Sequence, residues 1–284
     1  QKMAGPQLRH VLGAMTTNRF TGVLTGTFIT SAERVTPRLR DAVTHAATKD
    51  AELVLATGRP PRWIYPVLDQ LPIRPICICV NGAVLYDSDT DRVVTARTLP
   101  PATLTRIMQL IDDVLPVSYA VERVGASAFD KCEELFLVTP DFLHLWDSEE
   151  HTVVDKTELA AKSAVKLLVR NDRKTAWDLY HLIKLVVPPE LAHITFSTDE
   201  GLLEISAPQV TKAAGLMAVA QFYGVPASDV VAFGDMPNDI EMLQWAGLGV
   251  AMGNADERVK VAADEITTSN DDFGVARVLE RLFP

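Results

Sequence analysis

Short apolar runs alternate with helical stretches near both ends of the chain. The runs are continuous and bounded by turn residues, as in residues 52–56, 73–80 and 230–233, which is typical of strands buried on both faces of a parallel sheet. Between them, apolar residues recur at helical spacing, as in residues 37–49 and 211–223. This alternation predicts a doubly wound, Rossmann-like α/β sheet.

The pattern changes in the middle of the chain. Residues 84–95 alternate as a short hairpin, and short strands and helices are then mixed up to residue 207. We therefore expect an α+β domain of residues 84–207, inserted between the core segments 19–83 and 208–284. Residues 1–18 come before the first predicted strand, and we interpret them as vector-derived or disordered.

The 284 residues carry a formal net charge of -10. Proteins that bind nucleic acids usually present a basic patch, and the sequence has no cluster of lysine and arginine, so we expect no nucleic-acid partner. The acidic charge also argues against an acidic membrane surface as a partner. No apolar run approaches the roughly 20 residues of a membrane span. The sequence does not indicate an oligomeric state.

The chain contains three cysteines, Cys77, Cys79 and Cys132. An odd number in a chain of this length favours reduced thiols and a cytoplasmic location. Cys77 and Cys79 are two positions apart in a predicted strand, and no third ligand is close in sequence. We interpret them as small buried side chains rather than as metal ligands.

Two carboxylates follow a predicted strand near the C-terminus. They are Asp235 and Asp239 in the run Gly234-Asp235-Met236-Pro237-Asn238-Asp239. The carboxyl ends of strands in an open α/β sheet form the ligand crevice, so we expect both side chains there. Two acids at this spacing suit Mg²⁺, which prefers oxygen ligands. An acidic turn that caps a helix fits the same pattern equally well.

Thr57-Gly58-Arg59 also follows a predicted strand. A hydroxyl and free backbone N–H groups at the start of a helix can hold a phosphate oxygen, although an ordinary turn has the same residues. Lys212 begins the helix that follows the insert, where its charge could neutralise a phosphate. A solvated surface lysine is the alternative interpretation of Lys212.

Taken together and in this order, the motifs resemble those of the Cof-type branch of the haloacid dehalogenase-like superfamily. The resemblance runs from about residue 20 to the C-terminus, and residues 84–207 take the place of that branch's α/β cap. The matching segments are Ala56-Thr57-Gly58-Arg59-Pro60, Asn81-Gly82-Ala83, Leu203-Glu204-Ile205 ahead of Lys212, residues 234–243, and Ala251-Met252-Gly253-Asn254-Ala255.

The resemblance implies roles for the matching residues. Thr57 and Gly58 would bind phosphate, and Lys212 would neutralise it. Asp235 would be a direct Mg²⁺ ligand, and Asp239 would hold the metal or its water. Two asparagines match motif positions near the ligand, Asn238 and Asn254. In the family, the cap closes over the core and selects the substrate, usually a small phosphorylated metabolite.

The first motif departs from the family pattern. In the family it reads Asp-x-Asp-Gly-Thr: the first aspartate attacks phosphorus and binds Mg²⁺, and the second is the general acid/base. Here the matching run is Val23-Leu24-Thr25-Gly26-Thr27. The first aspartate of the chain is Asp41, in the next predicted helix, and Glu33 is the only acid before it. No shift of register therefore restores the motif.

This departure predicts lost or altered chemistry. Val23 can neither attack nor ligate a cation, and Thr25 has no pKa suited to proton transfer near neutrality. Loss of the nucleophile in covalent catalysis can cost on the order of 10⁶ in rate. We expect a protein that binds a small phosphorylated or otherwise anionic metabolite under its cap, is not a conventional phosphatase, and binds Mg²⁺ more weakly.

Other functions are compatible with the same residues. Asp235, Asp239 and Lys212 could serve an elimination, isomerisation or cyclisation, none of which needs an aspartyl-phosphate. A residual Mg²⁺-dependent phosphatase could use water or a threonine directly. A scaffold or regulatory subunit is a further alternative, because a fold does not fix a function.

Overall fold

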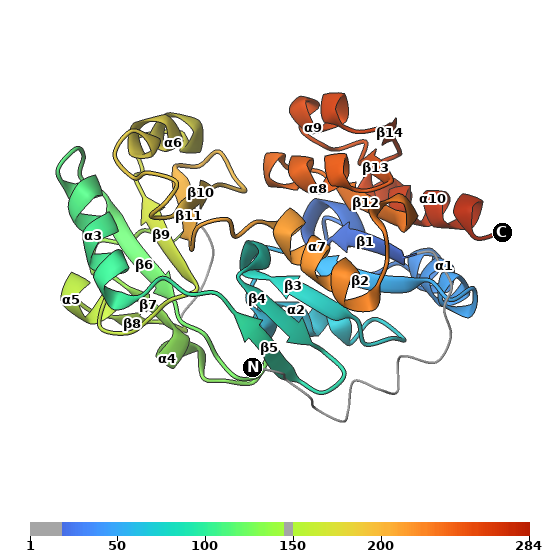
Figure 1. Ribbon diagram of the computed structural model, residues 1–284, viewed down its shortest axis with the longest axis horizontal. Helices are drawn as coiled ribbons and strands as arrows, with labels where there is room; N and C mark the ends of the chain where they lie inside the picture. The colour runs from blue at the N-terminus through green and yellow to red at the C-terminus, as the bar shows by residue number, and fades with distance from the viewer. Residues whose placement is uncertain (1–18, 145–149) are drawn as a thin grey trace.

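The computed structural model describes residues 19–144 and 150–284, and for residues 19–25 it describes the backbone alone. The interpretation of residues 1–18 therefore lies outside the described residues. Within the described ranges, the chain forms two sheets of eight and six strands, shown in Figure 1. No helix in these ranges is both long and apolar enough to cross a membrane.

The first sheet is built outward from β1 (Arg19–Val23), which lies between β12 (Val230–Gly234) and β2 (Glu52–Ala56). Its strands are parallel from β14 to β3, as the doubly wound fold requires. The other strands are β13 (Leu248–Ala251) and β14 (Glu265–Ile266) beyond β12, and β3 (Ile76–Cys79), β4 (Val84–Asp87) and β5 (Arg92–Ala96) beyond β2.

Helices cover this sheet and are delimited by ordinary caps. Thr36 accepts the N–H of Leu39 at the start of α1, and Gly224, with φ 68°, ends α7, a conformation that glycine adopts without strain. The helices are α1 (Pro37–Thr48), α2 (Pro61–Leu68), α7 (Lys212–Tyr223), α8 (Ile240–Trp245), α9 (Glu257–Ala262) and α10 (Gly274–Leu282).

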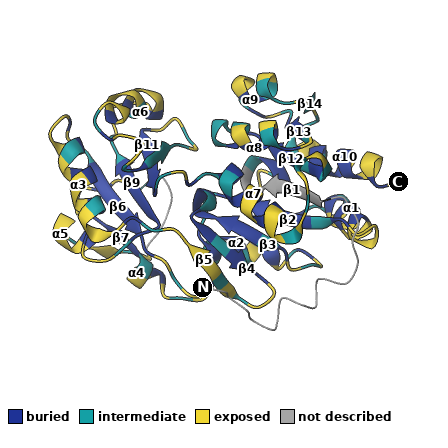
Figure 2. Cartoon of the chain, viewed as in Figure 1, coloured by how far each residue is buried: buried dark blue, intermediate teal, exposed yellow. Residues whose placement is uncertain are grey.

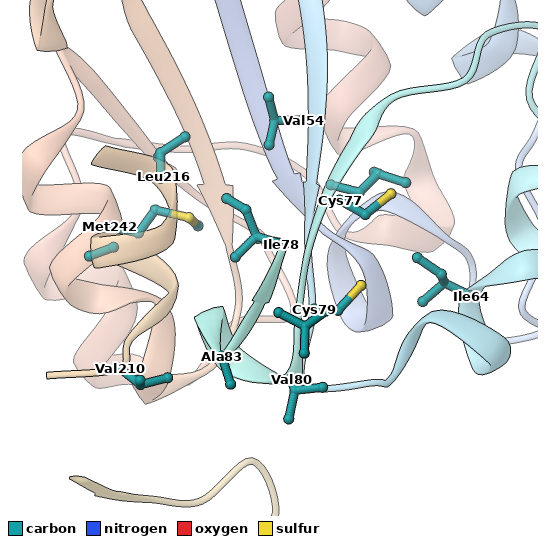
Figure 3. Packing of buried hydrophobic residues seen from close by; sticks show 14 of the residues in the cluster. Val54, Ile64, Cys77, Ile78, Cys79, Val80, Ala83, Val210, Leu216 and Met242 are labelled. Carbon is teal, nitrogen blue, oxygen red and sulfur yellow. The ribbon is translucent and has the colours of Figure 1, made fainter. Parts of the chain in front are cut away.

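Strand β3 shows how the sheet packs on both faces. Figure 3 shows Ile78 directed toward Leu216 of α7, while Cys77 and Cys79 point the other way, toward Ile64 of α2. All three β3 side chains are fully buried. The two cysteines therefore serve as small core side chains, as predicted. In Figure 2 the central strands β2, β3, β6 and β9 are buried, whereas the edge strand β5 and the outer faces of the helices are exposed.

The second sheet is formed by the part of the chain between β5 and α7. Its strands, in order across the sheet, are β10 (His193–Thr195), β11 (Leu202–Ser206), β9 (Lys166–Arg170), β6 (Ser118–Glu122), β7 (Phe136–Val138) and β8 (Thr152–Val153). Its helices are α3 (Pro101–Asp112), α4 (Cys132–Leu135), α5 (Lys156–Leu159) and α6 (Ala176–Lys184). Short strands and helices are thus mixed here, as expected for an inserted α+β unit.

The hairpin formed by β4 and β5 differs from the expected assignment to the insert. It forms as predicted, but β4 pairs antiparallel with β3 and so belongs to the first sheet. The turn between them reverses the chain through positive φ angles at Val80 (51°), Asn81 (54°) and Gly82 (101°). Because β4 and β5 extend the first sheet, we propose that the insert begins after β5 rather than at residue 84.

Candidate functional site

Four parallel strands of the first sheet end at the same edge. Gly26 and Thr27 follow β1, Thr57 follows β2, Asn81 follows β3 and Asp235 follows β12. In a doubly wound sheet the ligand crevice lies outside these carboxyl ends, where the strand order reverses. The strand order on either side of β1 therefore brings together residues that are distant in sequence.

Asp235 is buried beside the loop that follows β1. Its side chain accepts a hydrogen bond from Thr27 Oγ1 at 2.8 Å. A Cβ on Gly26 would lie 2.1 Å from Asp235 Oδ2, and Gly26 has φ +74°, so both the close approach and the backbone conformation require glycine. Burial raises the pKa of Asp235 to about 6, and the nearby charge of Asp239 adds to the effect.

Asp239 is fully buried and holds Lys212. Its Oδ1 accepts a hydrogen bond from Lys212 Nζ at 2.7 Å, and its Oδ2 accepts the backbone N–H groups of Asp235 and Met236, each at 3.0 Å. Lys212 is itself only 4% exposed. Asp239 therefore fixes both the loop after β12 and the position of the lysine, and both of its oxygens have partners within the protein.

Thr57 is 2% exposed at the turn after β2. Its Oγ1 accepts the backbone N–H of Arg59 at 3.1 Å, and its carbonyl accepts the N–H of Asn81 at 2.9 Å. The first contact uses the hydroxyl as an acceptor, so its proton can be donated to an anion. The structure thus ties the turn after β2 to the turn after β3.

A buried network that the sequence did not predict joins the second sheet to these turns. Lys166 Nζ, on β9, donates to Gly58 O at 2.8 Å and to Glu204 Oε2, on β11, at 2.7 Å. Asn81 Nδ2 donates to the same Glu204 oxygen at 2.8 Å, and Ser197 Oγ donates to Glu204 Oε1 at 2.7 Å. Burial raises the pKa of Glu204, but the charge of Lys166 and the hydrogen bonds lower it overall. The carboxylate is therefore ionised.

A sequence signal for this network was present. Lys166 and Glu204 are charged residues within otherwise apolar strand segments, and Glu204 belongs to the Leu203-Glu204-Ile205 motif. A charge inside a buried strand needs a partner. The identity of that partner depends on strand pairing, which places Glu204 next to β9.

The asparagines of the matching motifs also contact these loops. Asn254 Nδ2 donates to Gly26 O at 2.7 Å. Asn238 Nδ2 donates to Asn81 Oδ1 at 3.3 Å. The buried Oδ1 of Asn238 has no hydrogen-bond partner among the described residues, so it can accept a hydrogen bond from a ligand. Glu33, the one acid before Asp41, is bound instead to Arg59 at 2.5 Å.

A cavity of about 400 Å³ opens between the two sheets. From the first-sheet side its polar lining includes Asn81, Lys212 and Asn238, together with Glu241 and Arg258. Thr57 and Asp235 are not among its lining residues. They are connected to it through hydrogen bonds, since Asn81 contacts Thr57 and Asp239 contacts both Asp235 and Lys212. The wall from the second sheet is mainly aromatic.

The carboxylates available for a cation are few. Within residues 19–144 and 150–284, no three histidine, cysteine, aspartate or glutamate side chains are grouped as a metal site requires. Asp235 and Asp239 are close, as predicted, but Asp239 is already paired with Lys212. The donor set provided by the described side chains therefore centres on Asp235.

Comparison with known proteins gives consistent matches. The sequence profile of haloacid dehalogenase-like hydrolases matches residues 24–279. The chain is 30% identical over 234 residues to 5-amino-6-(5-phospho-D-ribitylamino)uracil phosphatase YitU of Bacillus subtilis, covering 81% of this chain and 84% of that protein. It is 25% identical over 279 residues to pyridoxal phosphate phosphatase YbhA of Escherichia coli, covering 93% and 98%.

Two solved structures share the fold. BT1666, a phosphatase from Bacteroides thetaiotaomicron, superposes with a TM-score of 0.77 at 24% identity, covering 99% of this chain and 98% of that one. The subclass IIB sugar phosphatase BT4131 superposes with a TM-score of 0.74 at 22% identity, covering 94% and 99%. At these identities the likeness concerns the fold alone.

Proposed function

The chain belongs to the haloacid dehalogenase-like hydrolase family, and we propose that it binds a small phosphorylated or otherwise anionic metabolite without forming an aspartyl-phosphate. The ligand would occupy the cavity between the two sheets, with the second sheet as its cap. The phosphate would lie toward Lys212, near the turns that carry Thr57 and Asn81.

The observation that carries this proposal is the setting of Lys212. The residue is buried at the start of α7, is oriented by Asp239, and lines the cavity. An ammonium group at a helix N-terminus combines two favourable interactions with an anion, its own charge and the helix dipole. A lysine kept only for solubility would be expected to extend into water instead.

The first strand supports the loss of conventional chemistry. Val23 is the last residue of β1 and pairs in register with Ala56, directly before Thr57. Val23 occupies the position of the family's nucleophilic aspartate, and Thr25 occupies that of its acid/base. The sequence therefore provides no carboxylate at either position. Without an acid there, attack on phosphorus through an aspartate has no starting group.

Mg²⁺ would be held mainly by Asp235 and by the oxygens of a bound phosphate. Such ions are often held by one or two carboxylates together with substrate phosphates, so the residues present fit an ion that binds with the ligand. When bound, the ion would neutralise phosphate charge. Because Val23 removes one anionic ligand of the family site, we expect weak binding of Mg²⁺ alone.

A Mg²⁺-dependent phosphatase is the second candidate. The observation in its favour is that YitU and YbhA, which align with most of this chain, are both named as phosphatases. This candidate requires a nucleophile other than an aspartate of the first motif, either water or a threonine. Both candidates predict that the protein binds a phosphorylated ligand. Only the second predicts that it hydrolyses the phosphate ester, so a measurement of turnover distinguishes them.

Calorimetric titration with inorganic phosphate in Mg²⁺-free buffer tests the binding proposal. The wild-type protein should bind phosphate, and Asn238→Asp, which places a negative charge on the cavity wall, should weaken binding at least about tenfold. Lys212→Met combined with Asp239→Asn removes the cation without leaving a buried unpaired charge and should weaken binding similarly. Glu257→Gln, at an exposed position of α9, is the control. Absence of phosphate binding, or equal binding by folded Asn238→Asp, would contradict the proposal.

A further inference from the structure

Aromatic side chains gather on the second-sheet side of the cavity. Trp177, Tyr180 and His181 on α6, and Phe196 after β10, all line it. The ring centroids of Tyr180 and Phe196 are 5.8 Å apart, and those of Trp177 and Phe196 are 6.3 Å apart, both pairs edge-to-face. The rings thus form one continuous wall rather than isolated surface contacts.

This wall lies at the edge of the hydrophobic core: Tyr180 and Phe196 pack against the core, whereas Trp177 lies outside it. The buried residues of α6 are Ala176, Leu179 and Ile183. The cavity-lining residues Trp177, Tyr180, His181 and Lys184 recur at helical spacing on another face of the same helix. Trp177 remains 46% exposed. An aromatic side chain that lines a cavity, remains this exposed and does not pack in the core, such as Trp177, is available to a ligand.

The rings are held in place from the opposite side of the cavity. The guanidinium carbon of Arg258, on α9, lies 5.3 Å from the centroid of the Trp177 ring. Arg258 is oriented by Asp256, with Nε 2.9 Å from Oδ1 and Nη2 2.8 Å from Oδ2. This cation–π contact connects α6 to α9 and restricts the indole. A restricted ring loses less conformational freedom when a ligand stacks on it.

The two walls of the cavity therefore have different chemistry. The first-sheet side presents the charged groups of Lys212, Arg258 and Glu241 and the amides of Asn81 and Asn238. The other side presents the ring surfaces of Trp177, Tyr180 and Phe196. We propose that the ligand is the phosphate monoester of a planar aromatic or heteroaromatic compound, with its ring against α6 and β10 and its phosphate toward Lys212. This inference rests on the proposed function. The volume of about 400 Å³ is within the range of small-molecule sites.

Phenyl phosphate and cyclohexyl phosphate test this inference, because they share the phosphate and the six-membered ring and differ in aromaticity. Affinities are measured calorimetrically in Mg²⁺-free buffer, so that hydrolysis does not interfere. The wild-type protein should bind phenyl phosphate about 3- to 10-fold more tightly, the range expected for one or two aromatic contacts. Trp177→Leu should reduce this ratio toward one and leave the affinity for inorganic phosphate unchanged.

Phe222→Leu is the matched control, since Phe222 is 60% exposed on α7 and does not line the cavity. It should leave the ratio as in the wild-type protein. Equal affinities for the two esters, or a ratio that Trp177→Leu does not change, would overturn the inference while binding of inorganic phosphate still supports the proposed function. Failure to bind inorganic phosphate would overturn both.

Discussion

Lys212 Nζ lies 2.7 Å from Asp239 Oδ1, and the two side chains are 4% and 0% exposed. Removing one partner of a buried pair leaves the other charge without compensation, which typically costs about 3–5 kcal/mol. We therefore expect Lys212→Met and Asp239→Asn each to lower the free energy of unfolding by about this amount, measured by urea denaturation. Lys212→Met with Asp239→Asn should cost less than the sum of the single changes.

The surface pair Lys260–Glu257 is the control for this experiment. Its Nζ–Oε1 distance is 2.8 Å, but the glutamate side chain is 84% exposed. Glu257→Gln should change the free energy of unfolding by less than about 1 kcal/mol. A change as small as this in Lys212→Met would show that the Lys212–Asp239 pair is not the buried support described above.

Asp235→Asn should stabilise the metal-free protein at neutral pH. Burial and Asp239 raise the pKa of Asp235 from its ordinary 3.8 to about 6. As the pH rises, Asp235 loses its proton in the unfolded chain at a lower pH than in the folded protein. The free energy of unfolding therefore falls between about pH 4 and about pH 6. Asparagine removes this loss and can still accept the hydrogen bond from Thr27. We expect a gain of about 1–3 kcal/mol above pH 6 and none near pH 4, measured by urea denaturation in EDTA.

Asp256→Asn should change the free energy of unfolding in the opposite direction to Asp235→Asn. The hydrogen bond from the Arg258 side chain is the main cause that lowers the pKa of Asp256 to about 2, so its ionised form stabilises the fold above about pH 4 and this stabilisation is lost as the pH falls toward 2. Asp256→Asn should therefore destabilise the protein at pH 7. If Asp235→Asn were the destabilising change at pH 7 instead, the assigned environment of Asp235 would be wrong.

Lys166 and Glu204 should show strong coupling. Glu204→Leu leaves Lys166 buried without its carboxylate and should cost about 3–5 kcal/mol, whereas Lys166→Met with Glu204→Leu should recover much of that loss. The control pair Lys156–Asp112 has the same distance of 2.7 Å, but its side chains are 48% and 36% exposed. Lys156→Met should cost at most about 1 kcal/mol. Additive effects of the Lys166 and Glu204 changes in a double-mutant cycle would argue against the network.

Alanine substitutions at Gly82 and Gly224 distinguish the cost of backbone strain from the cost of steric crowding. Both have positive φ, 101° and 68°. A Cβ on Gly82 would meet Thr211 O at 2.2 Å, directly before Lys212, whereas a Cβ on Gly224 meets nothing within 4 Å. Gly224→Ala should cost about 1 kcal/mol, and Gly82→Ala should cost clearly more and weaken phosphate binding by displacing the start of α7. Equal shifts in melting temperature would contradict this.

The sequence predicted the elements of the first sheet better than those of the second. Residues 52–56 form β2 and residues 212–223 form α7, as predicted within one residue, because an uninterrupted apolar run or a periodic stripe marks each. The strands Ser118–Glu122 and Lys166–Arg170 were not predicted. Their charged or polar ends interrupt the apolar pattern. One end of each strand contacts the first unit, since Glu122 accepts from Arg62 of α2 and Lys166 donates to Gly58 O.

The sequence indicated which residues belong to the candidate site, but not which of their side chains contact one another. Lys212 and Asp239 are separated by 27 positions, and Lys166 and Glu204 by 38. Their contacts depend on how α7 and the strands of the second sheet pack, which local sequence does not specify. The pairing of β4 with β3 was not predicted for the same reason, since the alternating pattern shows that a hairpin forms but not which strand it joins.

The most direct test of the account is the rate of Mg²⁺-dependent hydrolysis of phenyl phosphate, compared between the wild-type protein and the restoring variant Val23→Asp with Thr25→Asp. We expect no hydrolysis above the buffer rate for the wild-type protein, and a clear gain for the variant, because nucleophile loss in such enzymes corresponds to a factor on the order of 10⁶. Efficient hydrolysis by the wild-type protein that is lost in Asp235→Asn would contradict the account.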